Sequence, residues 1–256
     1  RLFTLASIIF SLSLLPVLLT RTHAPLPEPP GPLRISPMLQ ASPVGFYGSL
    51  AAGLMNAAFY TMGPLFGTEV GFSIEQISLF MAVGILGGLV LQMPIGRYSD
   101  RVERRLVIAG VSVALALACL VLVILVEQEV ALAWLLGGSF VYGCLSFTIY
   151  SLSAAHANDW GDPERRMQTS GALLAGFGIG AVIGPLVAGW MMGELGPQGL
   201  FTFNGIVAIV LAIYSVAHAF KPREQPKVPF VPQPGTQFTS DELYQAAQEE
   251  VEQKPE

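Results

Sequence analysis

The chain has 256 residues, of which 52% are hydrophobic and 12% are charged, and its formal net charge is −5. Soluble domains carry about twice this share of charged residues, so the composition excludes an ordinary water-soluble domain. The acidic balance and the lack of a basic block also argue against nucleic-acid binding. The charges lie in short stretches between long apolar runs, which is typical of a polytopic membrane protein.

Seven apolar segments are each long enough to cross about 30 Å of hydrocarbon as an α-helix. They are residues 2–19, 44–66, 76–95, 106–126, 131–153, 169–192 and 200–220. Backbone groups inside a lipid layer must be hydrogen-bonded within their own segment. We therefore expect an all-α membrane protein with seven transmembrane helices.

The placement of basic residues orients these predicted helices, because Lys and Arg accumulate at the cytoplasmic ends of spans. When the seven spans are threaded back and forth, every Lys and Arg except Arg1 falls on one side. The opposite loops, residues 67–75, 127–130 and 193–199, carry only glutamates as charged residues. This asymmetry predicts a cytoplasmic C-terminus.

The first span, residues 2–19, has two interpretations. A preceding arginine and the small-residue stretch around Ala24 are compatible with a secretory signal peptide. The alternative, which we favour, is the last helix of a missing front part, because the chain lacks an initiator methionine and the number of spans is odd. The next segment, residues 20–43, contains seven prolines and is predicted to be a cytoplasmic linker with little regular helix.

The third span ends in a distinctive loop. Gly96 is followed after three residues by Asp100 and Arg101, and after two more by Arg104 and Arg105. This spacing resembles the signature loop of the major facilitator superfamily, although Glu103 replaces a glycine of the full pattern. We expect Gly96 to permit close approach of another backbone, and Asp100 to face the positive N-terminal end of a neighbouring helix.

The resemblance extends over residues 42–220, which look like the back half of the YcaD-like branch of that superfamily. It implies a conformational latch made by Gly96, Asp100, Arg101, Arg104 and Arg105. The positive-inside rule is the alternative explanation of the arginines, but it does not explain the glycine and the aspartate at this spacing.

Members of the superfamily contain two six-helix bundles, so the resemblance implies a division of this chain. Residues 1–19 correspond to the sixth helix of a parent transporter, and residues 20–43 to the linker between bundles. Residues 44–220 correspond to the C-terminal six-helix bundle. Residues 221–256 are expected to be a cytoplasmic tail, largely disordered, with a short acidic helix that begins near a capping box of Thr239 and Glu242.

Neutral polar side chains inside the spans are candidates for a substrate cavity, because the span centres contain no Asp, Glu, Lys or Arg. The candidates are Asn56, Tyr60, Gln92, Tyr142, Tyr150 and Asn204. The first and fourth helices of a bundle line the cavity in the family, which favours the residues at 56, 60, 142 and 150. Each side chain has the alternative role of a hydrogen bond between helices.

The span 169–192 is rich in glycine. Gly176, Gly180 and Gly184 recur every four residues, which predicts close packing against another helix. The functional alternative is that Gly184 and Pro185 form a bend, as in a Gly-Pro motif that antiporters of the superfamily carry in the equivalent helix of the other half.

His156 and Asp159 end the fifth span near Arg165 and Arg166. A gate is one interpretation, because a histidine titrates near neutral pH. A water-exposed helix end is the other, and we favour it.

Taken with the resemblance, these features predict a secondary active transporter of a small solute, working by alternating access in a bacterial inner membrane. The expected partners are the lipid bilayer, the solute and the missing N-terminal half; proton coupling stays open because no relay is present. Cys119 and Cys144 lie inside apolar runs, so no metal site or cofactor is expected. The rival interpretations are a non-transporting scaffold or receptor of the same fold and, less favoured, a membrane enzyme, for which no catalytic cluster is evident.

Overall fold

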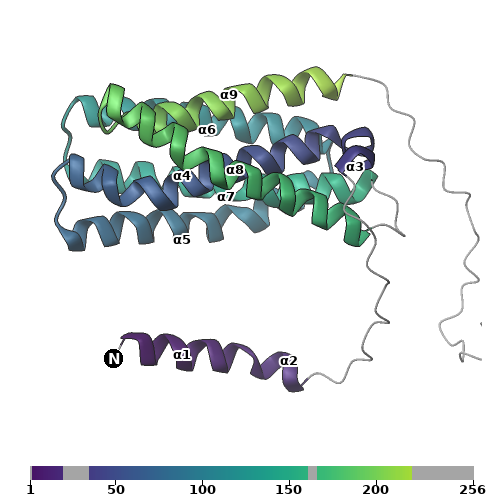
Figure 1. Ribbon diagram of the computed structural model, residues 1–256, viewed down its shortest axis with the longest axis horizontal. Helices are drawn as coiled ribbons and strands as arrows, with labels where there is room; N and C mark the ends of the chain where they lie inside the picture. The colour runs from purple at the N-terminus through teal and green to yellow at the C-terminus, as the bar shows by residue number, and fades with distance from the viewer. Residues whose placement is uncertain (1, 20–34, 161–165, 221–256) are drawn as a thin grey trace, which may run out of the picture.

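The structure is a computed structural model that describes residues 2–19, 35–160 and 166–220. Every regular element in this part of the chain is an α-helix (Figure 1). The helices are, in chain order, α1 (Leu2–Ser13), α2 (Leu15–Leu19), α3 (Ile35–Ala41), α4 (Pro43–Glu69), α5 (Ile74–Ser99), α6 (Arg104–Glu127), α7 (Leu132–Trp160), α8 (Arg166–Leu195) and α9 (Gly199–Ala219). The all-α prediction is therefore confirmed for the described residues.

Six of the predicted spans coincide with one long helix each, from α4 to α9. Five of these, α5 to α9, are long and apolar enough to cross a membrane. Helix α4 has 27 residues but is not among the five. Most of its buried positions are glycine, alanine or serine, residues that suit contact between helices better than contact with lipid. Its weak hydrophobicity thus reflects a position inside the bundle.

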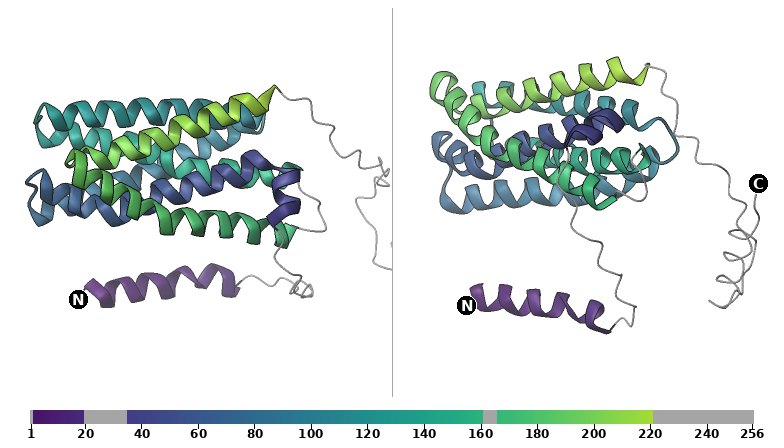
Figure 2. Two further views of the ribbon diagram at one scale, coloured as in Figure 1. Left: turned by 45° about the horizontal axis from the view of Figure 1, so that its top comes forward. Right: turned by 45° about the vertical axis from the view of Figure 1, so that its right-hand side comes forward.

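The segment 2–19, predicted as one span, is divided into α1 and α2 at Leu14. Pro16 explains the interruption, because its ring removes a backbone donor and clashes with the carbonyl four residues earlier. With 12 and 5 residues, neither helix reaches the length of a span, so the count of seven is not confirmed. Figures 1 and 2 show this pair standing apart from the other helices, and its large apolar side chains are exposed.

The predicted linker lies outside the described residues up to position 34, as does the whole predicted tail, residues 221–256. At the end of the linker, α3 forms where little helix was expected. Pro37 does not prevent it, because this proline occupies the first turn, where backbone N–H groups have no acceptor within the helix. Met38 of α3 packs with Phe46 and Leu173, so α3 covers one end of the bundle.

The bundle is built from three pairs of helices that are distant in sequence. Helix α4 packs along α8, α5 along α7, and α6 along α9. Helix α4 also contacts α5, α7 and α9, and α7 also contacts α4, α6 and α8, so these two helices are central in the bundle. Figures 1 and 2 show the six long helices running side by side along the long axis of the bundle.

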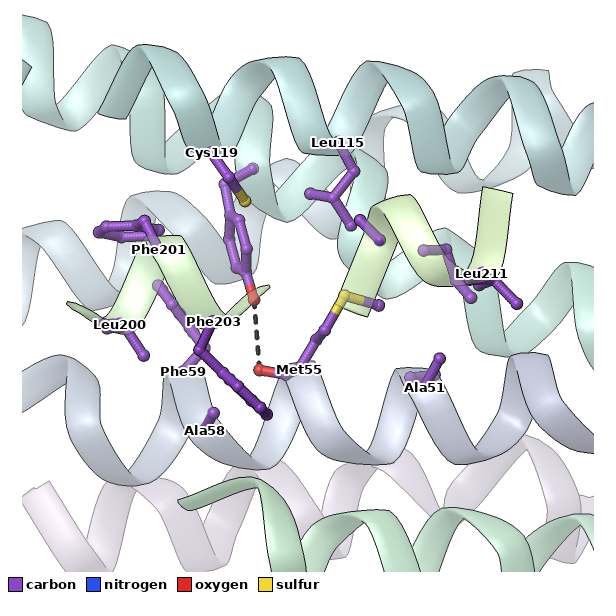
Figure 3. Packing of buried hydrophobic residues seen from close by; sticks show 14 of the residues in the cluster. Ala51, Met55, Ala58, Phe59, Leu115, Cys119, Leu200, Phe201, Phe203 and Leu211 are labelled. Carbon is purple, nitrogen blue, oxygen red and sulfur yellow. Dashed lines mark hydrogen bonds between the residues drawn. The ribbon is translucent and has the colours of Figure 1, made fainter. Parts of the chain in front are cut away.

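An apolar core fills the space between α4, α6, α7 and α9. Figure 3 shows Met55 and Phe59 of α4 facing Leu115 of α6 and Phe201 of α9. The ring of Phe59 also lies 5.0 Å from that of Tyr142. Fully buried aromatic side chains of this size fix the spacing of the helices, because each one buries a large area against several neighbours.

The two ends of the bundle differ in charge. The loop between α5 and α6 lies beside the C-terminal ends of α7 and α9, since Arg104 contacts Asp159 and Arg105 contacts His218. We call this the arginine end; it also carries Arg97 and Arg101. The loops and helix ends at the opposite end, the glutamate end, carry Glu69, Glu75, Glu127, Glu129 and Glu194.

Candidate functional site

A cavity of about 470 Å³ lies between α4, α5, α7 and α8. Four of the six predicted cavity residues line it, namely Asn56, Tyr60, Gln92 and Tyr150. The other lining residues are Ile85, Gly88, Leu89, Phe147, Ser151, Leu174 and Phe177. Tyr60, Leu89 and Leu174 are 48%, 69% and 60% exposed, so the cavity opens at the surface of the bundle.

The cavity wall combines aromatic rings with neutral polar groups. The rings of Tyr60 and Phe147 lie 5.5 Å apart, and those of Tyr150 and Phe177 lie 5.4 Å apart. Gln92 donates a hydrogen bond from Nε2 to the Ser151 hydroxyl at 2.5 Å, which joins α5 to α7 at the cavity. None of the described lining residues carries a charge.

A buried polar network lies behind the cavity. The Ser146 hydroxyl donates to the side-chain oxygen of Asn56 at 2.7 Å. The Tyr142 hydroxyl donates to the Met55 carbonyl at 3.2 Å and accepts from the Asn204 side-chain nitrogen at 3.0 Å. The network therefore joins α4, α7 and α9 by hydrogen bonds between neutral groups.

Tyr142 and Asn204 were predicted to line the cavity, but the structure places both elsewhere. Each is fully buried, and neither is among the cavity-lining residues. A polar group inside an apolar bundle must find a hydrogen-bond partner, and these two find each other. Their geometry is that of the interhelical hydrogen bond, the alternative that the sequence left open.

The glycines of α8 lie against the backbone of α4. A Cβ added at Gly180 would collide with the Leu50 carbonyl, and one at Gly184 with the Leu54 carbonyl. A Cβ at Gly176 would lie 3.1 Å from the Phe46 ring. Helix α8 continues through Pro185 without interruption. The geometry is therefore that of close helix packing, with no break at the predicted bend.

The signature loop (residues 96–105) is held by Arg104, the first residue of α6. Its guanidinium pairs with Asp100 at 2.6 Å and with Asp159 of α7 at 2.5 Å, and it donates to the Ser99 hydroxyl at 2.9 Å. Asp100 thus faces the side chain of Arg104, which is the first residue of α6. No described atom lies within 4 Å of a Cβ built on Gly96, so the close approach predicted there is not made inside this bundle.

Arg105 is buried and forms a second anchor. It donates to the His218 carbonyl at the end of α9 at 2.6 Å and pairs with Glu103 at 2.7 Å. Its guanidinium also lies 5.7 Å from the ring centre of Trp160. The hydrogen bond from Arg105 lowers the pKa of the Glu103 carboxyl below its usual 4.5. Arg101 is exposed.

The predicted pair of His156 and Asp159 separates into two environments. Asp159 is exposed and pairs with Arg104 of the signature loop. His156 is only 1% exposed, so the prediction of a water-exposed helix end is wrong for this residue. Its ring lies 6.3 Å from that of Trp160, next to the Arg105 anchor. The predicted neighbour Arg165 lies outside the described residues.

Sequence reasoning missed Phe147, Ser151 and Phe177 as cavity residues, and it missed the pairing of Asp159 with Arg104. One signal was present: Phe147 and Ser151 stand four residues apart, and Phe147 and Tyr150 three apart, which places them on one face of a helix. The pairing had no signal of this kind, because 55 residues separate its partners. Among the described residues, no group of three or more His, Cys, Asp or Glu side chains could hold a metal ion.

These features define a helical membrane protein with an open, uncharged cavity in its bundle and an ion-paired loop at one end. The family model of the Major Facilitator Superfamily matches residues 2–156 and, in a second overlapping alignment, residues 45–248. The chain belongs to the Major Facilitator Superfamily.

Three relatives illustrate the similarity, and each is described as an uncharacterized MFS-type transporter. Those of Enterobacter sp. and Yersinia enterocolitica are each 28% identical over 200 residues, which is 77% of this chain and 50% of the relative. The protein YcaD of Escherichia coli is 26% identical over 214 residues, which is 82% of this chain and 54% of the relative. The chain thus spans about half the length of the curated relatives it matches.

Proposed function

We propose that the protein is part of a secondary active transporter that moves a small solute across a membrane by alternating access. The observation that carries this proposal is the uncharged cavity between α4, α5, α7 and α8 in a chain of this superfamily. Its volume of about 470 Å³ is within the range of about 300–1,000 Å³ of small-molecule sites.

The open side of the cavity supports a division into two bundles. Residues 44–220 form the C-terminal bundle, with α4 as a further membrane-crossing helix beside the five that are long and apolar enough. The second wall comes from an N-terminal half of the same protein, to which residues 1–19 belong as its sixth helix. Residues 20–43 link the halves, and residues 221–256 form a cytoplasmic tail. The relatives, about twice as long as the matched segment, agree with this arrangement.

The signature loop acts as a latch in this mechanism. Arg104 joins the loop to α7 through Asp159, and Arg105 joins it to α9 through the His218 carbonyl. In the ion pairs of Arg104 with Asp100 and Asp159 both carboxylates are exposed. Ion pairs near the surface contribute about 0–1 kcal/mol each, which suits contacts that form and break in every transport cycle. Gly96, with no described neighbour over its Cβ position, and Arg101 are left to meet the other half.

The arginine end faces the cytoplasm of a bacterial cell, which follows from the positive-inside rule. A membrane-impermeant thiol reagent should label an Arg101→Cys variant in inverted inner-membrane vesicles and leave it unlabelled in intact spheroplasts. The reverse result would invert this orientation. The described cavity lining carries no charged group, so any coupling to protons uses groups outside this lining.

The transport proposal is tested with the full-length protein that contains these residues, reconstituted in liposomes. Exchange of radiolabelled solutes is measured across a panel of sugars, nucleosides, amphipathic aromatic compounds and organic acids. We expect at least one solute to exchange faster than in protein-free liposomes. No exchange across the whole panel would contradict the proposal and favour a scaffold or receptor.

The latch is tested with Asp100→Ala and Arg104→Ala under the same conditions. Asp100→Ala removes one exposed pair and should slow exchange about two- to fivefold. Arg104→Ala removes both ion pairs and the contact to Ser99 together, so its effect should be larger. Glu127→Ala, at the glutamate end, is the matched control and should not change the rate. Equal rates for all three variants would exclude the latch.

A further inference from the structure

The residues that line the cavity between α4, α5, α7 and α8 indicate which chemical class of solute it binds. This inference rests on the proposed function, since it concerns the ligand of the same cavity. From the geometry of its wall we propose that the solute is an uncharged molecule with a flat aromatic ring system, which carries a hydrogen-bond acceptor and a donor at its edge.

The aromatic part of the proposal follows from the paired rings. Tyr60 with Phe147, and Tyr150 with Phe177, present two ring pairs along one cavity, at 5.5 and 5.4 Å between ring centres. Ring pairs bind other rings more favourably than they bind polyols, because offset and edge-to-face contacts add to the burial of apolar area. Sugars and aliphatic chains would not make these ring–ring contacts.

The donor and acceptor proposed for the solute follow from the hydrogen bonds that Asn56 and Gln92 already make inside the protein. The side-chain oxygen of Asn56 accepts from Ser146, so its Nδ2 group remains as a donor. The Nε2 group of Gln92 donates to Ser151, so its side-chain oxygen remains as an acceptor. The cavity therefore offers one amide donor from α4 and one amide acceptor from α5. A ligand that carries both a carbonyl and an N–H group can use both.

The absence of charge follows from the cost of desolvation. No described lining residue is charged, so a carboxylate or ammonium that leaves water to contact this wall finds no counter-ion on it. A neutral amide loses far less on transfer, provided that its donor and acceptor are both satisfied. The wall thus discriminates against ions of the same shape.

The probe for this proposal is 2-naphthamide, which is neutral and carries a carbonyl and an NH₂ group on two fused rings. Its comparison ligands are 2-naphthoate, which has the same rings with a negative charge, decahydro-2-naphthamide, which has the amide without aromatic rings, and maltose. Binding is measured by equilibrium dialysis on the full-length protein in lipid nanodiscs. Binding to empty nanodiscs is subtracted.

We expect 2-naphthamide to bind at least about tenfold more tightly than each of the three comparison ligands, which corresponds to about 1.4 kcal/mol. Equal or tighter binding of 2-naphthoate would overturn the uncharged class. Equal binding of the decahydro compound would overturn the aromatic class.

Substitutions of cavity residues test whether 2-naphthamide binds in this cavity. Tyr60 is 48% exposed, so Tyr60→Leu should fold normally; it should weaken 2-naphthamide binding about two- to tenfold, because the ring contact is lost. Tyr60→Phe keeps the ring and should bind like wild type. Gln92→Leu removes the acceptor and should weaken binding about three- to tenfold, with a smaller effect on the ester methyl 2-naphthoate, which has no N–H. Trp190→Leu, in an exposed aromatic residue of α8 outside the cavity, is the control.

Unchanged binding in both Tyr60→Leu and Gln92→Leu would show that 2-naphthamide lies elsewhere and would overturn the assignment to this cavity. The outcome is separable from that of the exchange assay. Selective 2-naphthamide binding without exchange of any solute would contradict the transport proposal and support the proposed ligand class. Exchange of a sugar without 2-naphthamide binding would support transport and contradict the ligand class.

Discussion

One hydroxyl group, that of Tyr142, joins three helices of the bundle. It donates to the Met55 carbonyl of α4 and accepts from Asn204 of α9, while its own ring belongs to α7. Hydrogen bonds between helices in lipid contribute about 0.6 kcal/mol on average and up to about 1.7 kcal/mol. This residue therefore stabilises the region behind the cavity and does not line the cavity itself.

Removal of this hydroxyl gives the first prediction. Tyr142→Phe should lower the free energy of unfolding by about 1 kcal/mol, because the Asn204 amide loses its acceptor and the Met55 carbonyl loses the hydrogen bond that it makes outside its own helix. Unfolding in mixed micelles with increasing dodecyl sulfate measures the change. Tyr98→Phe, in a 62% exposed side chain, is the control and should have no effect. Equal effects of the two variants would contradict the structural role of the network.

The pair of Glu103 and Arg105 gives a pH-dependent prediction. The folded-state pKa of Glu103 is lowered from 4.5 by the hydrogen bond from Arg105. Folding therefore favours the carboxylate, so this stabilisation is fully present above pH 4.5 and is lost as the pH falls through the folded value. The difference in thermal midpoint between wild type and Glu103→Gln should be constant near neutral pH and should shrink below pH 4.5. In an Arg105→Gln background the same substitution should show no such pH dependence; a persistent effect would exclude Arg105 as the cause.

At the scale of elements, the contact between α4 and α8 depends on glycines at defined positions. Gly180→Ala places a methyl group on the backbone of α4 and should destabilise the protein by about 1–3 kcal/mol, the cost of overpacking. Gly178 lies on the same helix with no described atom within 4 Å of its Cβ position. Gly178→Ala should therefore be neutral or slightly stabilising, because alanine favours helix. Thermal unfolding of both variants measures the contrast, and equal destabilisation would contradict the packing.

The sequence predicted the long helices well and their facing sides less well. Apolar runs between charged loops mark where a helix crosses lipid, and α4 to α9 begin and end within several residues of the predicted spans. The facing side of each helix was harder to predict, because polar and apolar residues are spread around α7 and their periodicity does not separate its cavity face from its core face. Tyr150 lines the cavity, while Tyr142, eight residues earlier, lies in the core. The break at Leu14 had a visible cause in Pro16, and α3 shows that a proline in a first turn does not exclude a helix.

At the scale of the whole molecule, the described residues form a wall on one side of the cavity, which opens at the surface of the bundle. Liposomes that contain only these 256 residues should therefore show no solute uptake above that of empty liposomes, because one wall cannot alternate between two closed states. Liposomes with the full-length protein are the positive control. Uptake by the 256-residue chain that is blocked by Arg104→Ala would contradict this prediction.

The central position of α4 also has a consequence for how the bundle is made. Helix α4 ends at Glu69, but its closest neighbour, α8, begins at Arg166, 97 positions later in the chain. At a synthesis rate of about 5–20 residues per second, α4 leaves the ribosome roughly 5–20 seconds before α8 is complete enough to cover its glycine face. During that interval the least apolar of the long helices meets lipid or an insertion factor where it will later meet Gly180 and Gly184. We therefore expect the insertion of α4 to depend more on cellular assistance than that of α5 to α9.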